Sequence, residues 1–396
     1  MTTWPAGWSL TRTPSDDQGL RLLNAQVLGS DGQFRWGSVT IADGVFCAAD
    51  QSGGTQVDAT TLWLTPGFVD AHTHLAWRAF DAADHDGLSL DEQRRDARLN
   101  AGRTLSAGVT SVRDAGGLAP EHAGELGGLR AALSVQPLGA EDARGPAHLR
   151  GRVQQLADAG ASWIKVLATG GVGSGDRVLD PIFDRTELKA IHAAAAHVRL
   201  PVMVHAWGGE ALTQALEFGA ASIEHAVLIS DEQCRIAAGQ GAFVVPTMWI
   251  YRDVLAMTQT GALPSTLATA AGRAVEAHPA AVRRCLEAGV ELALGTDAGL
   301  DSQHGNNLHE LAALIEAGVP TGTALLAGTA GGARLLGRPD LGTLRQGSPA
   351  DLVCFSADPR RLDVLRDSSQ VDAVFVRGHL VHSSAHSAPD QLRTVP

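Results

Sequence analysis

Apolar, strand-like runs alternate with helix-like segments throughout residues 63–337, and this alternation constrains the fold more than any other feature. It is the pattern of consecutive βα units. Eight strand-like runs fall within these 275 residues, which is the scale of a (β/α)8 barrel. The runs are Trp63–Ala71, Thr110–Asp114, Ala132–Pro137, Trp163–Leu167, Pro201–Ala206, Ser222–His225, Ala242–Pro246 and Glu291–Gly295.

Helix-like segments separate these runs, and a doubly wound open sheet is the alternative arrangement of the same units. The third strand is the least clearly defined, because it lies in the Gly-rich segment 115–145. Helices are expected at Asp91–Ala107, Ala147–Ala159, Arg185–Val198, Gly209–Phe218, Asp231–Ala238, Ala271–Ala288, Leu308–Ala317 and Thr321–Leu336.

The two ends of the chain read as short β-strands, which predicts a smaller domain built from both termini. A hairpin is expected around Asp43-Gly44, because this pair is a strong turn signal. We therefore expect an α/β chain in which a barrel spans 63–337 and a small β-sandwich-like domain combines 1–62 with 338–396. The expected terminal strands are Leu20–Leu28, Ser38–Ile41, Val45–Ala48, Ala350–Phe355 and Val371–Val376.

The composition excludes several classes of partner. The chain has 31 basic and 43 acidic residues, a net charge of −12 and no long basic run, so we expect neither nucleic acid nor anionic membranes as partners. No stretch reaches the roughly 18 uninterrupted apolar residues of a membrane span, and Met1–Asp17 lacks the features of a signal peptide. The four cysteines are widely separated, as expected for free thiols in the cytoplasm.

Ionisable side chains lie at the ends of five predicted strands, where barrel active sites form. His72 and His74 end the first strand, and their spacing places both imidazoles on one face. Alone, this pair also fits two hydrogen-bonded histidines at a strand end. An open sheet would not close six such side chains around one axis. The four others are Lys165, His205, His225 and Asp297, from strands four, five, six and eight.

Lys165 and Lys189 are the only lysines among the 31 basic residues. Because the chain uses Arg wherever a positive charge suffices, a retained Lys indicates chemistry that needs an amine able to lose its proton. Lys189 lies in a helix-like stretch and reads as a surface residue. For Lys165 the alternative is an ion pair with a neighbouring acid.

These motifs resemble the amidohydrolase superfamily over nearly the whole chain. The resemblance rests on the P-G-F-V-D-A-H-T-H run at 66–74, the strand-six I-E-H and the strand-eight G-T-D. The run from Trp163 to Val172 is similar to the branch of Xaa-Pro dipeptidases (prolidases), imidazolonepropionase-like enzymes and N-acyl amino acid hydrolases. In that branch the strand-four Lys is carboxylated and bridges two metal ions.

The resemblance implies two divalent ions, zinc, joined by a CO2-derived carbamate on Lys165. His72, His74, Lys165 and Asp297 would hold one ion, and Lys165, His205 and His225 the other. Two such ions lie about 3.5–4 Å apart and need an anionic bridge. The expected function is a binuclear metal-dependent amidohydrolase in which a metal-bridging hydroxide attacks an amide carbonyl. Asp297 would shuttle the proton, and the substrates would be N-acyl amino acids or Xaa-Pro dipeptides.

Candidate substrate-binding residues lie on the loops after the strands. The resemblance links Tyr251, the only Tyr of the chain, to a substrate carboxylate, and Arg252 can pair with such a group bidentately. Trp207 and His304 follow strands five and eight. Core packing of the aromatics and a surface position for Arg252 are the alternatives. The short segment 115–160 leaves little room for a loop over the substrate, so other amides, carbamates or lactams also fit.

Two other functions remain open. A mononuclear imidazolonepropionase-like ring hydrolase or deaminase would not need Lys165, and such deaminases place an acid shortly after the strand-five His, where this chain has Ala206-Trp207-Gly208-Gly209. A non-catalytic barrel scaffold would be expected to lack ligands, and none is missing. By analogy with the family, we expect a homo-oligomer that acts on a small molecule.

Overall fold

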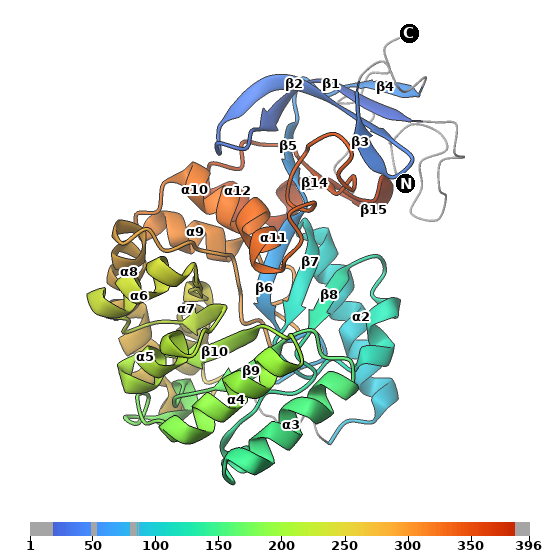
Figure 1. Ribbon diagram of the computed structural model, residues 1–396. Helices are drawn as coiled ribbons and strands as arrows, with labels where there is room; N and C mark the ends of the chain where they lie inside the picture. The colour runs from blue at the N-terminus through green and yellow to red at the C-terminus, as the bar shows by residue number, and fades with distance from the viewer. Residues whose placement is uncertain (1–18, 49–53, 80–84, 86, 385–396) are drawn as a thin grey trace.

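A barrel of parallel strands and surrounding helices forms the lower part of the molecule, and a sheet made from both chain ends lies above it (Figure 1). The computed structural model describes residues 19–48, 54–79, 85 and 87–384. The segment Met1–Asp17, in which no signal peptide was expected, lies outside the described residues.

The barrel prediction is confirmed. Its strands form two parallel groups, β6-β7-β8 and β9-β10-β11-β12. A parallel bridge between Leu138 and Val166 joins β8 to β9, and bridges at Leu292 and Ala298 join β12 to β6. The strands are β6 (Phe68–Thr73), β7 (Val109–Asp114), β8 (Arg130–Leu133), β9 (Ile164–Leu167), β10 (Val202–Ala206), β11 (Ser222–His225) and β12 (Phe243–Val245).

Two predicted strands differ from the structure for identifiable reasons. The expected strand Glu291–Gly295 is an extended segment with isolated bridges, because the Leu294 amide donates to the Ala327 carbonyl and not to a neighbouring strand. The expected strand Ala132–Pro137 ends at Leu133, and Val135 has a φ of +64°, outside the β region.

Helices pack around the barrel as predicted, with one addition and one interruption. Tyr251 and Arg252 were expected on a loop after strand seven. This expectation was wrong, because both lie in helix α7, which begins at Met248. The expected helix Thr321–Leu336 is interrupted by a π-helical segment, Ala327–Gly331. The helices are α2 (Leu90–Ser106), α3 (Pro146–Asp158), α4 (Arg185–His197), α5 (Gly209–Glu217), α6 (Asp231–Gln240), α7 (Met248–Thr260), α8 (Ala268–Glu287), α9 (His309–Glu316), α10 (Thr321–Leu326), α11 (Gly332–Leu335) and α12 (Leu362–Leu365).

The terminal sheet combines eight strands in the order β15-β14-β13-β5-β1-β2-β3, with β4 paired to β1. The predicted hairpin around Asp43-Gly44 is confirmed as the antiparallel pair of β2 and β3. These strands are β1 (Leu20–Leu28), β2 (Phe34–Ala42), β3 (Val45–Cys47), β4 (Thr55–Asp58), β5 (Trp63–Pro66), β13 (Leu352–Phe355), β14 (Val371–Val376) and β15 (His379–Ser383).

The expected single strand Trp63–Ala71 is two strands in two sheets. β5 pairs with β1 and β13 in the terminal sheet, and β6 opens the barrel. Gly67 separates them, and its amide donates to the Asp351 carbonyl. A Cβ atom at Gly67 would lie 2.2 Å from Thr110 Oγ1, so only glycine allows this close approach.

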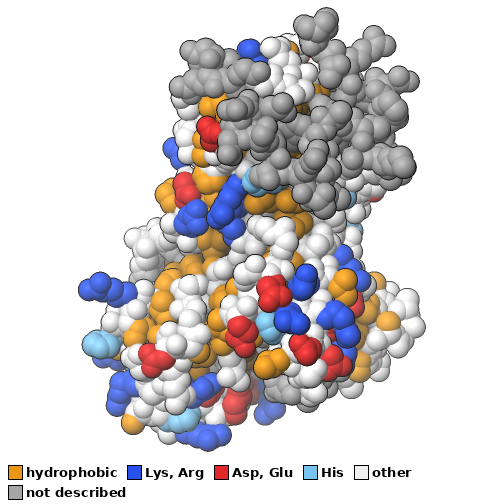
Figure 2. All heavy atoms as spheres, turned by 90° about the vertical axis from the view of Figure 1, so that its right-hand side faces the viewer, with side chains coloured by type: hydrophobic (Ala, Val, Ile, Leu, Met, Phe, Trp, Pro, Cys, Tyr) orange, Lys and Arg blue, Asp and Glu red, His pale blue; other side chains and the backbone are white. Residues whose placement is uncertain are grey.

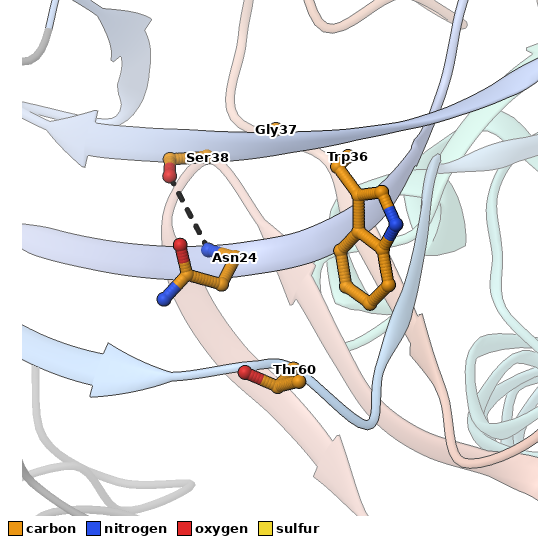
Figure 3. A pocket seen from close by; sticks show the side chains of 5 residues that line it. All are labelled: Asn24, Trp36, Gly37, Ser38 and Thr60. Carbon is orange, nitrogen blue, oxygen red and sulfur yellow. Dashed lines mark hydrogen bonds between the residues drawn. The ribbon is translucent and has the colours of Figure 1, made fainter.

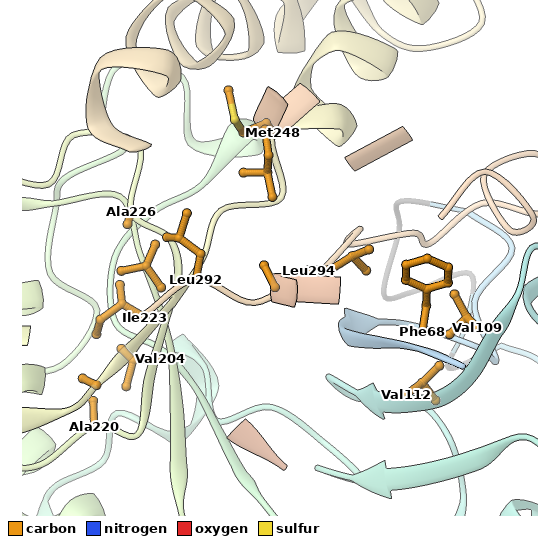
Figure 4. Close-up of a cluster of buried hydrophobic side chains, with 14 of the residues drawn as sticks. Phe68, Val109, Val112, Val204, Ala220, Ile223, Ala226, Met248, Leu292 and Leu294 are labelled. Atoms are coloured by element: carbon orange, nitrogen blue, oxygen red, sulfur yellow. The ribbon is translucent and has the colours of Figure 1, made fainter. Parts of the chain in front are cut away.

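Buried apolar side chains from the barrel and the terminal sheet meet at Phe68. Figure 4 shows Phe68 beside Val109 and Val112 of β7, with Leu294 nearby. The Phe68 ring also packs edge-on against Phe355 of β13, with 6.1 Å between centroids. This contact fixes the start of β6, and therefore the direction in which its far end presents His72.

The surface shows no single-sign face in the view of Figure 2, where acidic and basic side chains are interspersed over the barrel. Among the described residues, no helix combines the length and apolar character needed to cross a membrane.

Candidate active site

His72 and His74 direct one ring nitrogen each toward Asp297. Their Nε2 atoms lie 3.1 Å and 3.3 Å from Asp297 Oδ1. The opposite nitrogens are occupied, because His72 Nδ1 lies 2.7 Å from Glu224 Oε2 and His74 Nδ1 lies 2.9 Å from the Gly116 carbonyl. Both acceptors require a proton on Nδ1, so each imidazole, when neutral, would present its Nε2 lone pair to a shared point.

Asp297 supplies the carboxylate at this point. Its backbone amide donates to the His72 carbonyl at 2.7 Å, which fixes the residue beside the end of β6. Burial raises the pKa of Asp297, but its interactions with His72 and His74 outweigh burial and hold the pKa well below its usual value. The group is therefore ionised, and its side chain retains 22% exposure.

Lys165 enters the same space from β9. Its Nζ atom lies 3.2 Å from His72 Nε2, and the residue is almost fully buried. Burial lowers the pKa of Lys165 to about 8. Among the described residues, no carboxylate lies within 4 Å of this amine, and Glu224 and Asp297 raise its pKa only from a greater distance.

His225 completes the converging group. Its Nδ1 atom lies 2.7 Å from Thr247 Oγ1. One ligand atom each from His72, His225 and Asp297 lies within 4.8 Å of the other two. Burial holds the pKa of His225 well below its usual value, so the imidazole is neutral. Neutral imidazoles and a carboxylate are the donors that Zn²⁺ prefers, and the residues present fit such an ion.

His205 lies beside this group but points one nitrogen elsewhere. Its ring centroid is 4.4 Å from that of His225, whereas its Nε2 atom lies 3.0 Å from the Gly170 carbonyl. A Cβ atom at Gly171 would lie 3.0 Å from His205 Cε1, so the loop approaches the ring closely. Burial lowers the pKa of His205 to about 4. The structure therefore provides a neutral imidazole here, with Nε2 facing the loop.

A buried ion pair that the sequence analysis did not assign supports His72. Arg113, fully buried, donates to Glu224 Oε1 at 2.9 Å, to Ser222 Oγ at 3.0 Å and to the Ala71 carbonyl at 2.7 Å. Burial raises the pKa of Glu224, but Arg113 and His72 together lower it to about 2. The available signal was a polar pair, Ser222 and Glu224, on one face of an otherwise apolar strand.

Three strand ends at the site carry strained backbone. His225, Thr247 and Asp297 have φ values of +71°, +54° and +55°, a region that non-glycine residues rarely adopt. Such strain persists only where the surroundings impose it, and it concentrates at functional sites. The geometry of these side chains therefore depends on contacts to their backbone as well as to their rings.

Of the expected substrate residues, Tyr251 and Trp207 lie beside the histidines. The Tyr251 ring is 5.3 Å from Trp207 and 6.0 Å from His225, and both aromatic residues are buried. They extend an apolar wall from the site toward the α7–α8 hairpin.

The other two expected substrate residues lie differently. Arg252 pairs with Glu316 of α9, which also pairs with Arg366. In the described part of the chain, no hydrogen bond or ion pair joins Arg252 to His72, His74, His205 or His225. His304 is buried and borders a hollow of about 510 Å³ together with Arg103 and Asp301.

A second hollow lies on the terminal sheet, and none of the described residues that line it is titratable. It has a volume of about 520 Å³ and includes Trp36, which is 64% exposed, with Asn24, Ser38 and Thr60 around it (Figure 3). Its described lining therefore lacks the histidine, aspartate and lysine side chains that meet at the ends of the barrel strands.

Comparison with known proteins agrees with this geometry. The chain is 29% identical to an imidazolonepropionase of Salinispora arenicola over 373 residues, covering 84% of this chain and 86% of that protein. It is 28% identical to an ochratoxinase of Aspergillus niger over 366 residues, covering 80% and 75%. A crystal structure of a Xaa-Pro dipeptidase with bound methionine superposes with a TM-score of 0.83 at 25% identity, covering 93% of this chain and all of that one.

The family model extends across both parts of the fold. It matches residues 63–381, from β5 through the barrel to β15. This span contains every converging side chain described above, and the relatives support a hydrolase acting on C–N bonds of small molecules. The chain belongs to the amidohydrolase family.

Proposed function

We propose that this protein is a binuclear metal-dependent amidohydrolase that hydrolyses N-acyl amino acids or Xaa-Pro dipeptides. The observation that carries the proposal is the buried Lys165 amine, 3.2 Å from His72 Nε2 and without a carboxylate partner among the described residues. A mononuclear site would not need this lysine. With a pKa of about 8, a substantial fraction of the amine is neutral near physiological pH, as reaction with CO2 requires.

The proposed metal ions are zinc. His72, His74 and Asp297 would hold one ion, His205 and His225 the other, and a carbamate on Lys165 would bridge them. When bound, such a pair lowers the pKa of water and polarises a carbonyl group. To act through Nε2, His205 has to give up its contact with the Gly170 carbonyl; Nδ1 is the alternative donor.

Asp297 is the proposed proton carrier. Its carboxylate is ionised and partly exposed, so it can accept the proton of the attacking water and deliver it to the leaving amine. Glu224 and Gly116 accept hydrogen bonds from His72 and His74 at Nδ1, and the proposed ion would occupy both Nε2 atoms, so these imidazoles would not compete for the transferred proton.

The substrate class rests on the relatives and on the wall beside the site. The Xaa-Pro dipeptidase relative favours an amide that carries an amino acid. Trp207 and Tyr251 would line the apolar side of the pocket. The imidazolonepropionase relative favours a second candidate, opening of a cyclic amide. We also propose a cytoplasmic location and a homo-oligomeric state.

A substrate panel tests the proposal. The zinc-loaded protein is assayed with N-acyl-L-amino acids, Xaa-Pro dipeptides and cyclic amides, and amine release or ring opening is measured. Turnover of the first two classes that is lost in Asp297→Asn supports the proposal. Turnover of cyclic amides alone, by protein holding one ion per chain, would replace it with the ring-hydrolase function.

A further inference from the structure

Helix α8 reaches into the site through a histidine that the proposed reaction does not use. His278 is 1% exposed, and its Nε2 atom lies 2.6 Å from the carbonyl oxygen of His225. A carbonyl oxygen only accepts hydrogen bonds, so Nε2 carries the proton and donates it. The contact joins α8 to the backbone of a proposed metal ligand 53 residues earlier.

The accepting carbonyl belongs to a strained residue. His225 and Ala226 have φ values of +71° and +52°, so the chain leaves β11 through two consecutive left-handed residues. This turn decides where the His225 imidazole points, because the side-chain direction follows from the backbone conformation. A strong bond to the carbonyl at this position opposes relaxation of the turn.

His278 is otherwise poorly suited to its place. Its Nδ1 atom is buried and has no hydrogen-bond partner among the described residues, which costs free energy that an apolar residue would avoid. The next residue, Pro279, lies inside the helix and cannot donate to the carbonyl four residues earlier. The chain thus tolerates two unfavourable features at the point where α8 contacts His225.

Further contacts hold His225 in place besides the bond from His278. Tyr251 packs against both, with centroids 5.5 Å from His278 and 6.0 Å from His225. Thr247 Oγ1 lies 2.7 Å from His225 Nδ1. His225 is therefore contacted at its carbonyl by α8, at its ring by Tyr251 of α7 and at its ring nitrogen by the residue before α7.

We propose that His278 is a positioning residue, whose Nε2–H···O bond to His225 holds the left-handed turn and aims the His225 imidazole at the metal site. The inference rests on the proposed function only for the identity of the bound group. It predicts that the orientation of His225 depends on a hydrogen-bond donor at the Nε2 position of residue 278 and not on the aromatic shape of that side chain.

Three substitutions separate the donor from the shape. His278→Phe keeps the ring but removes the donor. His278→Gln places an amide nitrogen near the Nε2 position, and His278→Asn places it near the Nδ1 position, away from the carbonyl. His192→Phe is the matched control, because His192 is also a buried helix histidine, but its ring packs against Phe218.

The first readout is metal affinity, measured by inductively coupled plasma mass spectrometry after dialysis against graded chelator. His278→Phe and His278→Asn should bind one of the two ions about 10–100-fold more weakly, the usual effect of losing an outer contact to a ligand. His278→Gln should stay within about threefold of wild type, and His192→Phe should match it. Equal affinities in the Gln and Asn variants would overturn the inference even if the Phe variant failed to fold.

The second readout does not need metal. Crystal structures of the metal-free Gln and Asn variants should show His225 retaining its positive φ in the former and losing it in the latter. An unchanged turn in both would overturn the positioning role. If the wild-type protein binds no ion, the proposed function fails, and these structures still decide the role of His278.

Discussion

His72 donates its Nδ1 proton to Glu224 at 2.7 Å across 152 residues of sequence. The same carboxylate accepts from Arg113 on its other oxygen. His72, Glu224 and Arg113 thus form a hydrogen-bonded chain that leads from the site into the barrel. At its end, the buried Arg113 guanidinium lies 4.3 Å from the Trp163 ring centroid. This chain fixes the tautomer of His72 and thereby keeps its Nε2 lone pair available.

Substitution Glu224→Gln should weaken both the fold and the site. The change leaves Arg113 buried without its counter-ion, so the free energy of unfolding should fall by about 3–5 kcal/mol. Metal affinity should fall about 10–100-fold, because His72 loses its charged acceptor. Chemical denaturation and chelator competition measure the two effects.

Glu187→Gln is the control for this experiment. Glu187 is a buried carboxylate whose oxygens accept from the backbone amides of Gly145 and Asp184. Its substitution should lower stability without changing metal affinity. Wild-type affinity in Glu224→Gln would show that the bond to His72 does not support a ligand.

Substitution Asp297→Asn should separate metal binding from turnover. The amide keeps the size of the carboxylate and an oxygen donor, so most metal should remain bound. Turnover should fall about 100- to 10,000-fold, because an amide cannot accept the proton of the attacking water. Steady-state kinetics on protein of measured metal content test this, and a rate within threefold of wild type at full occupancy would eliminate the role of Asp297.

The two lysines make the proposed carbamate directly observable. Protein equilibrated with ¹³C-bicarbonate should show a lysine carbamate signal in its carbon NMR spectrum. Lys165→Arg should lose this signal and the second metal ion, since a guanidinium does not react with CO2. Lys189→Arg should keep both, because Lys189 is exposed on α4. A signal that follows Lys189, or none in wild type, would contradict the bridge.

His192 should make stability depend on pH. Burial lowers the pKa of His192 from 6.5 to about 4, so between these values the unfolded chain binds a proton that the folded chain does not. Its contribution is therefore constant above pH 6.5 and is lost as the pH falls toward 4. The free energy of unfolding of His192→Phe minus that of wild type should therefore be about 2 kcal/mol larger at pH 5 than at pH 7.5.

Urea unfolding of both proteins at the two pH values measures this gain. A difference between the two proteins that does not change with pH would show that His192 takes up its proton equally in the folded and unfolded states.

The strand ends could be predicted from the sequence because their signal is local. The ranges of β1, β11 and β14 match the prediction, and His72, Lys165, His225 and Asp297 converge as expected from barrel geometry. Alternation of apolar residues and the H-x-H spacing depend only on neighbouring positions.

The errors arise where a distant residue decides the local structure. Helix α7 was missed because no side chain at its own start caps it. Instead Glu310, more than 60 residues later, accepts from the amides of Met248 and Trp249. The contacts of Glu224 and His278 likewise join elements far apart in sequence, so spacing gives no signal for them. Gly67, which divides the expected first strand, is required by contact with Thr110.

The central claim is a pair of metal ions joined at Lys165, and the metal content of the purified wild-type protein tests it most directly. Protein produced with zinc and bicarbonate is analysed by inductively coupled plasma mass spectrometry against an accurate protein concentration. The account predicts close to two ions per chain. One ion per chain would contradict the bridged pair and favour the mononuclear ring hydrolase, and none would contradict the metal site itself.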